Sequence, residues 1–235
     1  MRKDQLSNRL QTVAGYVRSG DVIADIGTDH GYLAVFLLEM GISPYAILGD
    51  VNEGPLSSAA EQVNLAGLQE RTSVKLGNGL DVLEGESVDT VIIAGMGGPL
   101  IAQILNNGEK RFSNVRRLIL QPNVAADHIR LWLYTHGWEL IDEKIIEEDG
   151  HIYEVITAEK GDPAKHYDGM AQDKQLWLGP ILLKEPNDAF KKKWNRELHQ
   201  LKKIRTRLDE TAVVENTLDK RREVEKKIQW LKEEL

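Results

Sequence analysis

Short apolar segments alternate with segments of helical periodicity from residue 21 onward, and this alternation restricts the fold more than any other feature. The segments VDTVIIAG and RRLILQP are apolar almost throughout, which is typical of parallel strands buried on both faces. Each is followed by a helical pattern, so the sequence predicts an α/β fold with a mostly parallel sheet covered by helices. Strands are predicted at residues 21–26, 45–50, 72–76, 88–94, 117–121, 138–146 and 151–158, and helices at 32–40, 55–66, 98–107 and 124–136.

The two ends of this pattern carry different signals. Apolar residues at positions 6, 10, 13 and 17 recur at helical spacing, which predicts an amphipathic helix before the first strand. The last two strands follow one another across the turn EEDG, a pattern typical of a hairpin. The sequence therefore predicts a seven-stranded sheet with an antiparallel strand at one edge.

The composition changes after Gly161. The segment EKGDPAKHYDG is polar and turn-rich, which predicts a boundary between a domain at residues 1–160 and a linker and helical segment at residues 161–235. The segment after residue 187 has two apolar seams at helical spacing. They predict two helices paired as an antiparallel coiled-coil hairpin that turns around residues 209–213, and one long helix is the alternative. The seams comprise Phe190, Trp194, Leu198, Leu201, Ile204 and Leu208, and then Val214, Leu218, Val224, Ile228, Leu231 and Leu235.

The charge of the chain is divided unevenly. Its 30 Lys plus Arg and 37 Asp plus Glu give a net charge of −7, which argues against general affinity for nucleic acid. Residues 191–235 hold 14 basic and 9 acidic residues, which is +5, and this leaves 16 basic and 28 acidic residues, which is −12, before them. A basic tail on an acidic body indicates an appendage that contacts a polyanion, or else basic side chains that cover a solvated helix.

Several classes of protein are disfavoured by what the sequence lacks. There is no cysteine, which excludes disulfides and thiolate metal sites. The sequence has no run of about 18 apolar residues, and its start, MRKDQLSNRL, has no apolar core of the kind a secretion signal needs. No ligand cluster with metal spacing is present. We therefore expect a cytoplasmic protein with no membrane span and no metal.

A glycine-rich turn follows the first predicted strand, at Gly27-Thr28-Asp29-His30-Gly31. Such a turn places backbone N–H groups and a helix N-terminus beside a ligand at the carboxyl edge of the sheet. The dinucleotide fingerprint G-x-G-x-x-G is absent, because Asp29 stands where its second glycine would lie. This carboxylate would repel a pyrophosphate and suit a cationic or amine-bearing ligand. The alternative is an ordinary strand-to-helix connection in which glycine is chosen for its backbone angles. His30 could likewise be a helix-cap residue.

Polar residues end the other strands of the same sheet. Asp50, about 25 residues after Asp25, stands where an acidic side chain accepts both hydroxyls of a ribose, although it could instead cap the next helix. Asn78 or Asp81 could reach an adenine amino group, although Asn-Gly is also a common turn. Strand four ends in AGMGGP, which leaves space for flat groups, and strand five ends in QPN, whose amides could read a base.

Together these residues resemble the class I S-adenosylmethionine-dependent methyltransferases, with D-x-G-x-x-x-G from Asp25 to Gly31 as the first motif and Asp50 as the second. The combination of SNRL near the start, ADIGTDHGYL, AGMGG, LILQPN and a terminal helical hairpin is similar to the bacterial tRNA (adenine-22-N1)-methyltransferase family, TrmK. The resemblance covers nearly the whole chain. It implies a Rossmann-like catalytic domain, a coiled-coil hairpin, S-adenosylmethionine as methyl donor and tRNA as substrate; position 22 and atom N1 rest on the resemblance alone.

The expected site follows from the motifs and the resemblance. The N1 lone pair of adenine can attack the sulfonium methyl directly, so positioning supplies most of the acceleration. A carboxylate beside the exocyclic amine would stabilise the cationic product, and Asp29 is the candidate, with Asn123 orienting the base. We expect the cofactor to be bound by Asp25, Gly27, Asp29, His30, Gly31, Asp50, Asn78, Gly79, Gly95 and Met96, and the substrate by Arg9, Gly97, Gly98 and Gln121. Met96 packing in the core and Arg9 pairing with an acidic residue are the alternatives.

Other functions remain open on the sequence alone. The cofactor motifs would also serve a small-molecule methyltransferase. A nicotinamide-dependent oxidoreductase could use GMGG as its phosphate loop, although the glycine order after strand one disfavours it. A noncatalytic coiled-coil scaffold is the third alternative, and the hairpin could equally bind RNA or mediate self-association.

Overall fold

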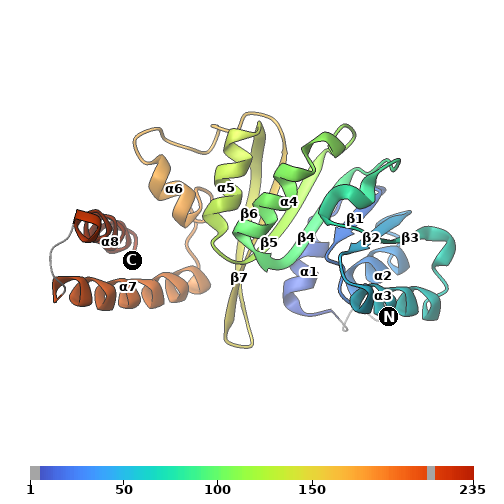
Figure 1. Ribbon diagram of the computed structural model, residues 1–235, viewed down its shortest axis with the longest axis horizontal. Coiled ribbons are helices and arrows are strands. Elements are labelled where there is room, and N and C mark those ends of the chain that lie inside the picture. The colour runs from blue at the N-terminus through green and yellow to red at the C-terminus, as the bar shows by residue number, and fades with distance from the viewer. Residues whose placement is uncertain (1–5, 211–214) are drawn as a thin grey trace. The chain divides into compact units, whose positions relative to one another are not determined.

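The structure, a computed structural model, describes residues 6–210 and 215–235 (Figure 1). A seven-stranded sheet has the order β3-β2-β1-β4-β5-β7-β6. The order reverses between β1 and β4, and ligands of open α/β sheets bind at such a switch point, outside the carboxyl ends of the strands. The strands are β1 (Ile23–Ile26), β2 (Ala46–Asp50), β3 (Thr72–Leu76), β4 (Thr90–Gly97), β5 (Arg117–Val124), β6 (Trp138–Glu148) and β7 (His151–Lys160).

The strand pairing confirms the predicted mostly parallel sheet. β1 pairs in parallel with β2 and β4, β2 with β3, and β4 with β5, whereas β5 and β7 are antiparallel. Asp149 and Gly150, both with positive φ, form the predicted tight turn between β6 and β7. The β6–β7 hairpin lies at one end of the sheet, with β6 as the edge strand and β7 between β5 and β6. Residues 154–158 of β7 are all buried, as expected of a strand with neighbours on both sides.

Helices cover both faces of the sheet (Figure 1). On one face α2 contacts both α1 and α3, and α2 and α3 pack on β1, β2 and β3. On the other face α4 packs against α5, β4 and β5. The five helices are α1 (Asn8–Ala14), α2 (Tyr32–Glu39), α3 (Glu53–Leu65), α4 (Gly98–Asn107) and α5 (Ala126–Thr135), and short 3-10 turns lie at Gln69–Arg71, Gly79–Leu83 and Glu109–Arg111.

The sheet core follows from the alternation of side chains along each strand. Ile23, Leu48, Ile92, Ile119 and Val155 belong to one buried cluster with the apolar residues of α1, α2 and α3. The intervening strand residues are also buried and point to the opposite face, because successive strand side chains alternate. This two-sided burial explains why the central strands β1, β2, β4 and β5 are mostly apolar.

Strands β4 and β5 each end three residues later than predicted. β4 continues through the glycine segment to Gly97, and β5 continues through Pro122 to Val124. The β4–β5 register shifts between Ala94 and Met96, which is a bulge, and Gly95 in the bulge has φ 81°. The glycines that suggested a strand end therefore mark a bulge within the strand.

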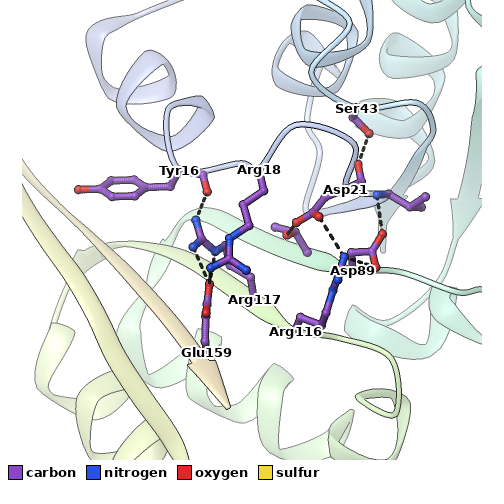
Figure 2. Close-up of polar contacts among 10 residues, drawn as sticks. Tyr16, Arg18, Asp21, Ser43, Asp89, Arg116, Arg117 and Glu159 are labelled. Atoms are coloured by element: carbon purple, nitrogen blue, oxygen red, sulfur yellow. Dashed lines mark hydrogen bonds and ion pairs between the residues drawn. The ribbon is translucent and has the colours of Figure 1, made fainter. Parts of the chain in front are cut away.

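Acidic and basic side chains tie together the amino ends of the central strands (Figure 2). The buried Asp21, just before β1, accepts hydrogen bonds from Thr90 Oγ1 at 2.6 Å and from Arg116 Nη2 at 3.2 Å. Arg116 also pairs with Asp89 at 2.9 Å, and Asp89 accepts from the backbone N–H of Val22 at 2.9 Å. These contacts fix the amino edge of β1, β4 and β5, on the side of the sheet away from the switch-point ligand edge.

A second group of contacts anchors the segment after α1 to the sheet (Figure 2). Arg117 of β5 donates to Glu159 of β7 and to the backbone carbonyl of Tyr16, and Arg18 also pairs with Glu159 at 2.7 Å. The Tyr16 hydroxyl donates to Asp142 at 2.7 Å, and burial together with this carboxylate raises the pKa of Tyr16. These bonds hold the end of the α1 segment beside β5, β6 and β7.

A fully buried ion triad lies between α5 and the β6–β7 hairpin. The Arg130 guanidinium donates from Nε to Glu143 Oε1 at 2.5 Å and from Nη2 to Glu154. The side chains of Arg130 and Glu143 have no exposed area, and that of Glu154 is 3% exposed. Buried charges are tolerated in the interior only when they pair with opposite charges.

The described chain forms two compact units. One contains residues up to Lys144 together with Tyr153–His166, and the other contains Ile145–Ile152 and Tyr167–Leu235. The second unit has helices α6 (Gln172–Leu178), α7 (Asp188–Asp209) and α8 (Glu215–Glu234) around its own apolar cluster. The predicted division at residue 160 stays a prediction.

Helices α7 and α8 contact each other, so the alternative of one long helix was wrong. Phe190, Trp194 and Leu201 of α7 share a buried cluster with Ile228 and Leu231 of α8. Arg221, which interrupts the second seam, pairs with Asp209 at 2.9 Å and with Glu225 at 3.2 Å. Most of the turn predicted at 209–213, and Val214, lie outside the described residues. No helix within residues 6–210 and 215–235 is long and apolar enough to span a membrane.

Candidate functional site at the carboxyl edge of the sheet

The turn between β1 and α2 is held against the end of β2. The backbone N–H groups of Gly27 and Thr28 both donate to the carbonyl of Gly49, at 2.8 and 3.2 Å. Gly27 and Gly31 have φ 73° and 70°, in the left-handed region where glycine is favoured. Asp29 shares this region with φ 51°, which is uncommon for a residue with a side chain. The turn therefore presents Asp29 in a conformation that the surrounding fold imposes.

Asp29 and His30 project outward from this turn. The Asp29 side chain is 73% exposed, and its Oδ1 lies 3.6 Å from His30 Nε2. The His30 ring lies 5.5 Å from the ring of Tyr32. Gly31 is the residue that precedes α2, so the alternative in which His30 caps this helix was wrong. Both predicted side chains are thus accessible at the carboxyl edge.

Asp25 lies buried at the base of the turn. Its Oδ2 accepts a hydrogen bond from Thr28 Oγ1 at 2.8 Å. Burial raises the pKa of Asp25 from 3.8 to about 6; the Thr28 hydrogen bond lowers it, and the charges of Asp50 and Asp29 add to the increase. Three carboxylates at the ends of β1 and β2 therefore create a negative field at this edge.

Replacing Asp25 with asparagine tests whether the pKa of this carboxyl is raised. Because the folded pKa exceeds the unfolded one, the carboxyl's contribution to stability is complete below about pH 4 and is lost as the pH rises through 6. Asp25→Asn should raise the free energy of unfolding by up to about 3 kcal/mol at pH 8 and by about half as much at pH 5. Urea unfolding of both proteins without cofactor measures the difference. An equal gain at the two pH values would contradict the raised pKa.

Asp50 ends β2 beside the same turn. It is 9% exposed, and its Oδ1 accepts from the backbone N–H of Asn52 at 2.8 Å. Asn52, not Asp50, is the residue that precedes α3, so the capping alternative for Asp50 was wrong. The hydrogen bond fixes the orientation of the carboxylate at the position predicted to bind a ribose.

The segment after β3 borders a small pocket. Asn78 precedes a 3-10 turn, and Gly79 begins it with φ 55°. Together with residues of α4 that include Leu100 and Gln103, they line a pocket of about 100 Å³. Asp81 also lines it, and a contact of Asn78 or Asp81 with an adenine amino group stays a prediction.

The bulge of β4 faces the turn after β1. A Cβ built on Gly27 would lie 2.1 Å from Met96 Cε, so the Met96 side chain occupies the space that the missing Cβ leaves. Met96 therefore packs on the turn, as its alternative interpretation held. Gly98 is explained differently: its Cβ would lie 1.9 Å from the carbonyl oxygen of Ala125, so backbone packing requires glycine there. Gly97 is the residue that precedes α4. Their predicted substrate contacts stay predictions.

Four residues from three elements form a network at the bulge. Gln121 Oε1 accepts from Arg9 Nη1 at 2.6 Å and from the Gly95 N–H at 3.0 Å. Gln121 Nε2 donates to Asn123 Oδ1 at 3.2 Å, and Asn123 Nδ2 donates to the Gly95 carbonyl at 2.8 Å. The Arg9 guanidinium also lies 5.5 Å from the ring centre of Tyr153. Gln121 is fully buried, so its direct contact with a base is disfavoured.

The structure thus brings most predicted residues to one edge, and it adds two that sequence reasoning missed. Thr28 bonds Asp25, and Tyr153 of β7 stacks under Arg9. A hydroxyl three residues after Asp25 is a weak signal, and nothing in the sequence links Tyr153 to Arg9. Among the described residues, no group of three or more His, Asp or Glu side chains could hold a metal ion.

This site suits an adenosine with a positively charged substituent. The Asp50 carboxylate can accept from ribose hydroxyls, and the field of Asp25 and Asp29 favours a sulfonium and an amine. The sheet order and these carboxylates define a class I S-adenosylmethionine-dependent methyltransferase. A family model described as tRNA (adenine(22)-N(1))-methyltransferase matches residues 23–233. The chain belongs to this family.

Individual relatives agree with this assignment. The chain is 44% identical over 233 residues to the tRNA (adenine(22)-N(1))-methyltransferase of Bacillus subtilis, which covers 99% of this chain and 98% of that protein. The crystal structure of B. subtilis TrmK superposes with a TM-score of 0.93 at 45% identity, over 97% of this chain and 98% of the other. Streptococcus pneumoniae Sp1610, in complex with S-adenosyl-L-methionine, has a TM-score of 0.84 at 39% identity, over 97% and 99%.

Proposed function

We propose that this protein transfers the methyl group of S-adenosylmethionine to N1 of the adenine at position 22 of tRNA. One observation carries the proposal: Asp50 ends β2, Asp29 follows β1 and Asn123 lies near the end of β5, so all three side chains belong to the carboxyl edge of one sheet. The first serves an adenosyl cofactor and the other two serve a purine acceptor. The Bacillus subtilis relative carries the corresponding name.

Each residue of the cofactor site has a distinct role in the proposal. Asp50 accepts the ribose hydroxyls, while Asp25 and the turn at Gly27 face the charged end. Asn78 and Gly79 border the adenine, and Met96 packs against the turn at Gly27. When bound, S-adenosylmethionine supplies an electrophilic methyl group on a sulfonium. The protein's contribution is to exclude water and align this group with the acceptor.

The acceptor side needs no covalent enzyme nucleophile. Adenine N1 has an in-plane lone pair, and methylation leaves the base with a positive charge. In this proposal the exposed Asp29 carboxylate stabilises that charge and accepts a proton from the exocyclic amine. Asn123 orients the base. Since N1 is used in Watson–Crick pairing, the target nucleotide must be unpaired or extruded.

The basic helices supply the polyanion surface in this proposal. Lys191, Lys202 and Lys203 are exposed on α7, while the catalytic body is acidic. A local basic patch on an acidic protein favours recognition of a shaped RNA over indiscriminate binding. Location in the cytoplasm and self-association through α7 and α8 stay predictions.

Methyl transfer from labelled S-adenosylmethionine tests the proposal. The substrates are two transcripts of one tRNA, with adenine or guanine at position 22. We expect label only in the transcript with adenine 22, and nucleoside analysis should identify 1-methyladenosine. Asp29→Asn should lower the rate even when the cofactor is saturating, because its amide cannot take the proton.

Two results would contradict the proposal. Equal labelling of both transcripts would exclude adenine 22 as the target. Labelling of neither, with S-adenosylmethionine binding demonstrated by calorimetry, would point to the small-molecule methyltransferase instead. Heat-unfolded protein serves as the control for nonenzymatic methylation.

A further inference from the structure

The buried amide of Gln121 has only one orientation that satisfies its neighbours. Its two partners on one side are the Arg9 guanidinium at 2.6 Å and the Gly95 backbone N–H at 3.0 Å. Both groups are donors only, so the atom between them must be the amide oxygen. The Gln121 nitrogen must then face Asn123. Because Gln121 has no exposed area, a reversed amide would leave buried donors facing one another.

The fixed orientation of the Gln121 amide in turn fixes the orientation of the Asn123 amide on the surface. Its Oδ1 must be the atom that accepts from Gln121 Nε2, at 3.2 Å, and its Nδ2 then donates to the Gly95 carbonyl at 2.8 Å. The charge of Arg9 therefore determines the donor and acceptor ends of an exposed amide two residues further along β5. Among the bonds that the described residues make, Asn123 uses one lone pair and one N–H, and it keeps the second of each.

The remaining donor and acceptor of Asn123 match one edge of adenine. The N6 amine donates and N7 accepts, and an asparagine amide can satisfy both at once. Binding along this edge leaves N1 unobstructed, as methylation requires. Guanine presents two acceptors, O6 and N7, on the same edge and would place O6 against the amide oxygen.

We propose that Asn123 selects the target base by binding N6–H and N7 of adenine, and that Arg9 and Gln121 are positioning residues that fix the direction of its amide. This inference rests on the proposed function. Direction matters because the amine lies between N1 and N7 on the adenine perimeter. The end of the amide that accepts from N6–H decides on which side N1 falls, and a reversed amide would turn N1 away from the methyl group.

A single-atom change in the substrate tests the contact. A tRNA transcript with 7-deazaadenosine at position 22 keeps N1 and the amine but has C–H in place of N7. Single-turnover methylation at saturating cofactor should be about 10-fold slower for this transcript than for adenine 22. Asn123→Ala should slow methylation of adenine 22 by a similar factor or more, and should show no further loss with 7-deazaadenine.

The control variant is Asn114→Ala. Asn114 is another exposed asparagine, bonded to Ser87 at 3.3 Å near the amino ends of β4 and β5. It should retain both the full rate and the full 7-deaza effect. Equal rates for the two substrates with the unaltered protein, or the same 7-deaza effect in Asn123→Ala, would overturn the inference. Absence of methylation on adenine 22 itself would overturn the proposed function and the inference with it.

Gln121→Glu tests the positioning role. Glutamate still accepts from Arg9 and Gly95 but cannot donate to Asn123. We expect kcat to fall about 10-fold, KM for tRNA to stay within 2-fold, and the 7-deaza effect to disappear. A purely structural role would lower the melting temperature and leave the ratio of adenine to 7-deazaadenine rates unchanged, which would overturn this part of the inference.

Discussion

Replacing Asp50 with alanine is expected to raise the Kd for S-adenosylmethionine about 100-fold, or about 3 kcal/mol. The carboxylate is 9% exposed, is oriented by the Asn52 N–H and stands at the carboxyl end of β2. Hydrogen bonds to a charged acceptor contribute about 1.5 to 3 kcal/mol each, and two ribose hydroxyls would lose their partner. Titration calorimetry with S-adenosylhomocysteine measures the same contact without turnover.

Glu53→Ala is the matched control for this loss. Glu53 is an exposed carboxylate three residues further on, in the first turn of α3. It removes the same charge from the same region but touches no predicted ligand group, so its Kd should change less than 3-fold. An Asp50→Ala protein that binds as tightly as the unaltered one would remove Asp50 from the cofactor site.

Replacing Arg130 with methionine should lower the free energy of unfolding by about 3 to 5 kcal/mol. The guanidinium pairs with Glu143 and Glu154, and all three side chains are buried. Its removal leaves two carboxylates in a low-dielectric interior without a cation, and burial of an uncompensated charge is among the most destabilising changes in a protein. Urea unfolding at pH 7, followed by fluorescence, gives the difference.

Two further proteins show whether the charges are the cause. Arg222→Met breaks an exposed pair with Asp219 and should change the stability by less than about 1 kcal/mol. A triple variant with apolar residues at positions 130, 143 and 154 should regain most of the loss, because it buries no charge. A triple variant as unstable as Arg130→Met would indicate that packing, and not charge, accounts for the effect.

The sequence predicted the central strands well because they are buried on both faces. The predicted β3 coincides with Thr72–Leu76, and α4 with Gly98–Asn107. The errors have local causes. Gly95 and Pro122 look like strand ends, but a bulge and continued pairing carry both strands further. Helix α6 was missed because its apolar residues, Leu176 to Leu178, are consecutive and give no helical spacing.

Only those site residues could be predicted whose position depends on a strand end alone. Asp25 and Asp50 follow from the rule that parallel strands bring their carboxyl ends to one edge. The Arg9–Gln121 bond joins residues 112 positions apart, and no local pattern reveals it. Arg9 was expected to bind the substrate or to pair with an acidic residue, and its bond to the Gln121 amide was not expected. Burial of Gln121 could not be foreseen either, because a strand-end amide resembles an exposed one in the sequence.

The division of the chain has a consequence for exchanging parts between related proteins. Its two compact units alternate along the polypeptide, since Ile145–Ile152 belongs to the unit that otherwise begins at Tyr167. The tip of the β6–β7 hairpin contributes Ile145 to the same cluster as Phe190 and Trp194, and the side chain of Asn187 donates to the Ile145 carbonyl at 3.0 Å. A chimera that replaced only the terminal helices would pair them with a foreign hairpin tip. The natural cassette for recombination is therefore discontinuous, with the hairpin tip travelling together with the terminal helices.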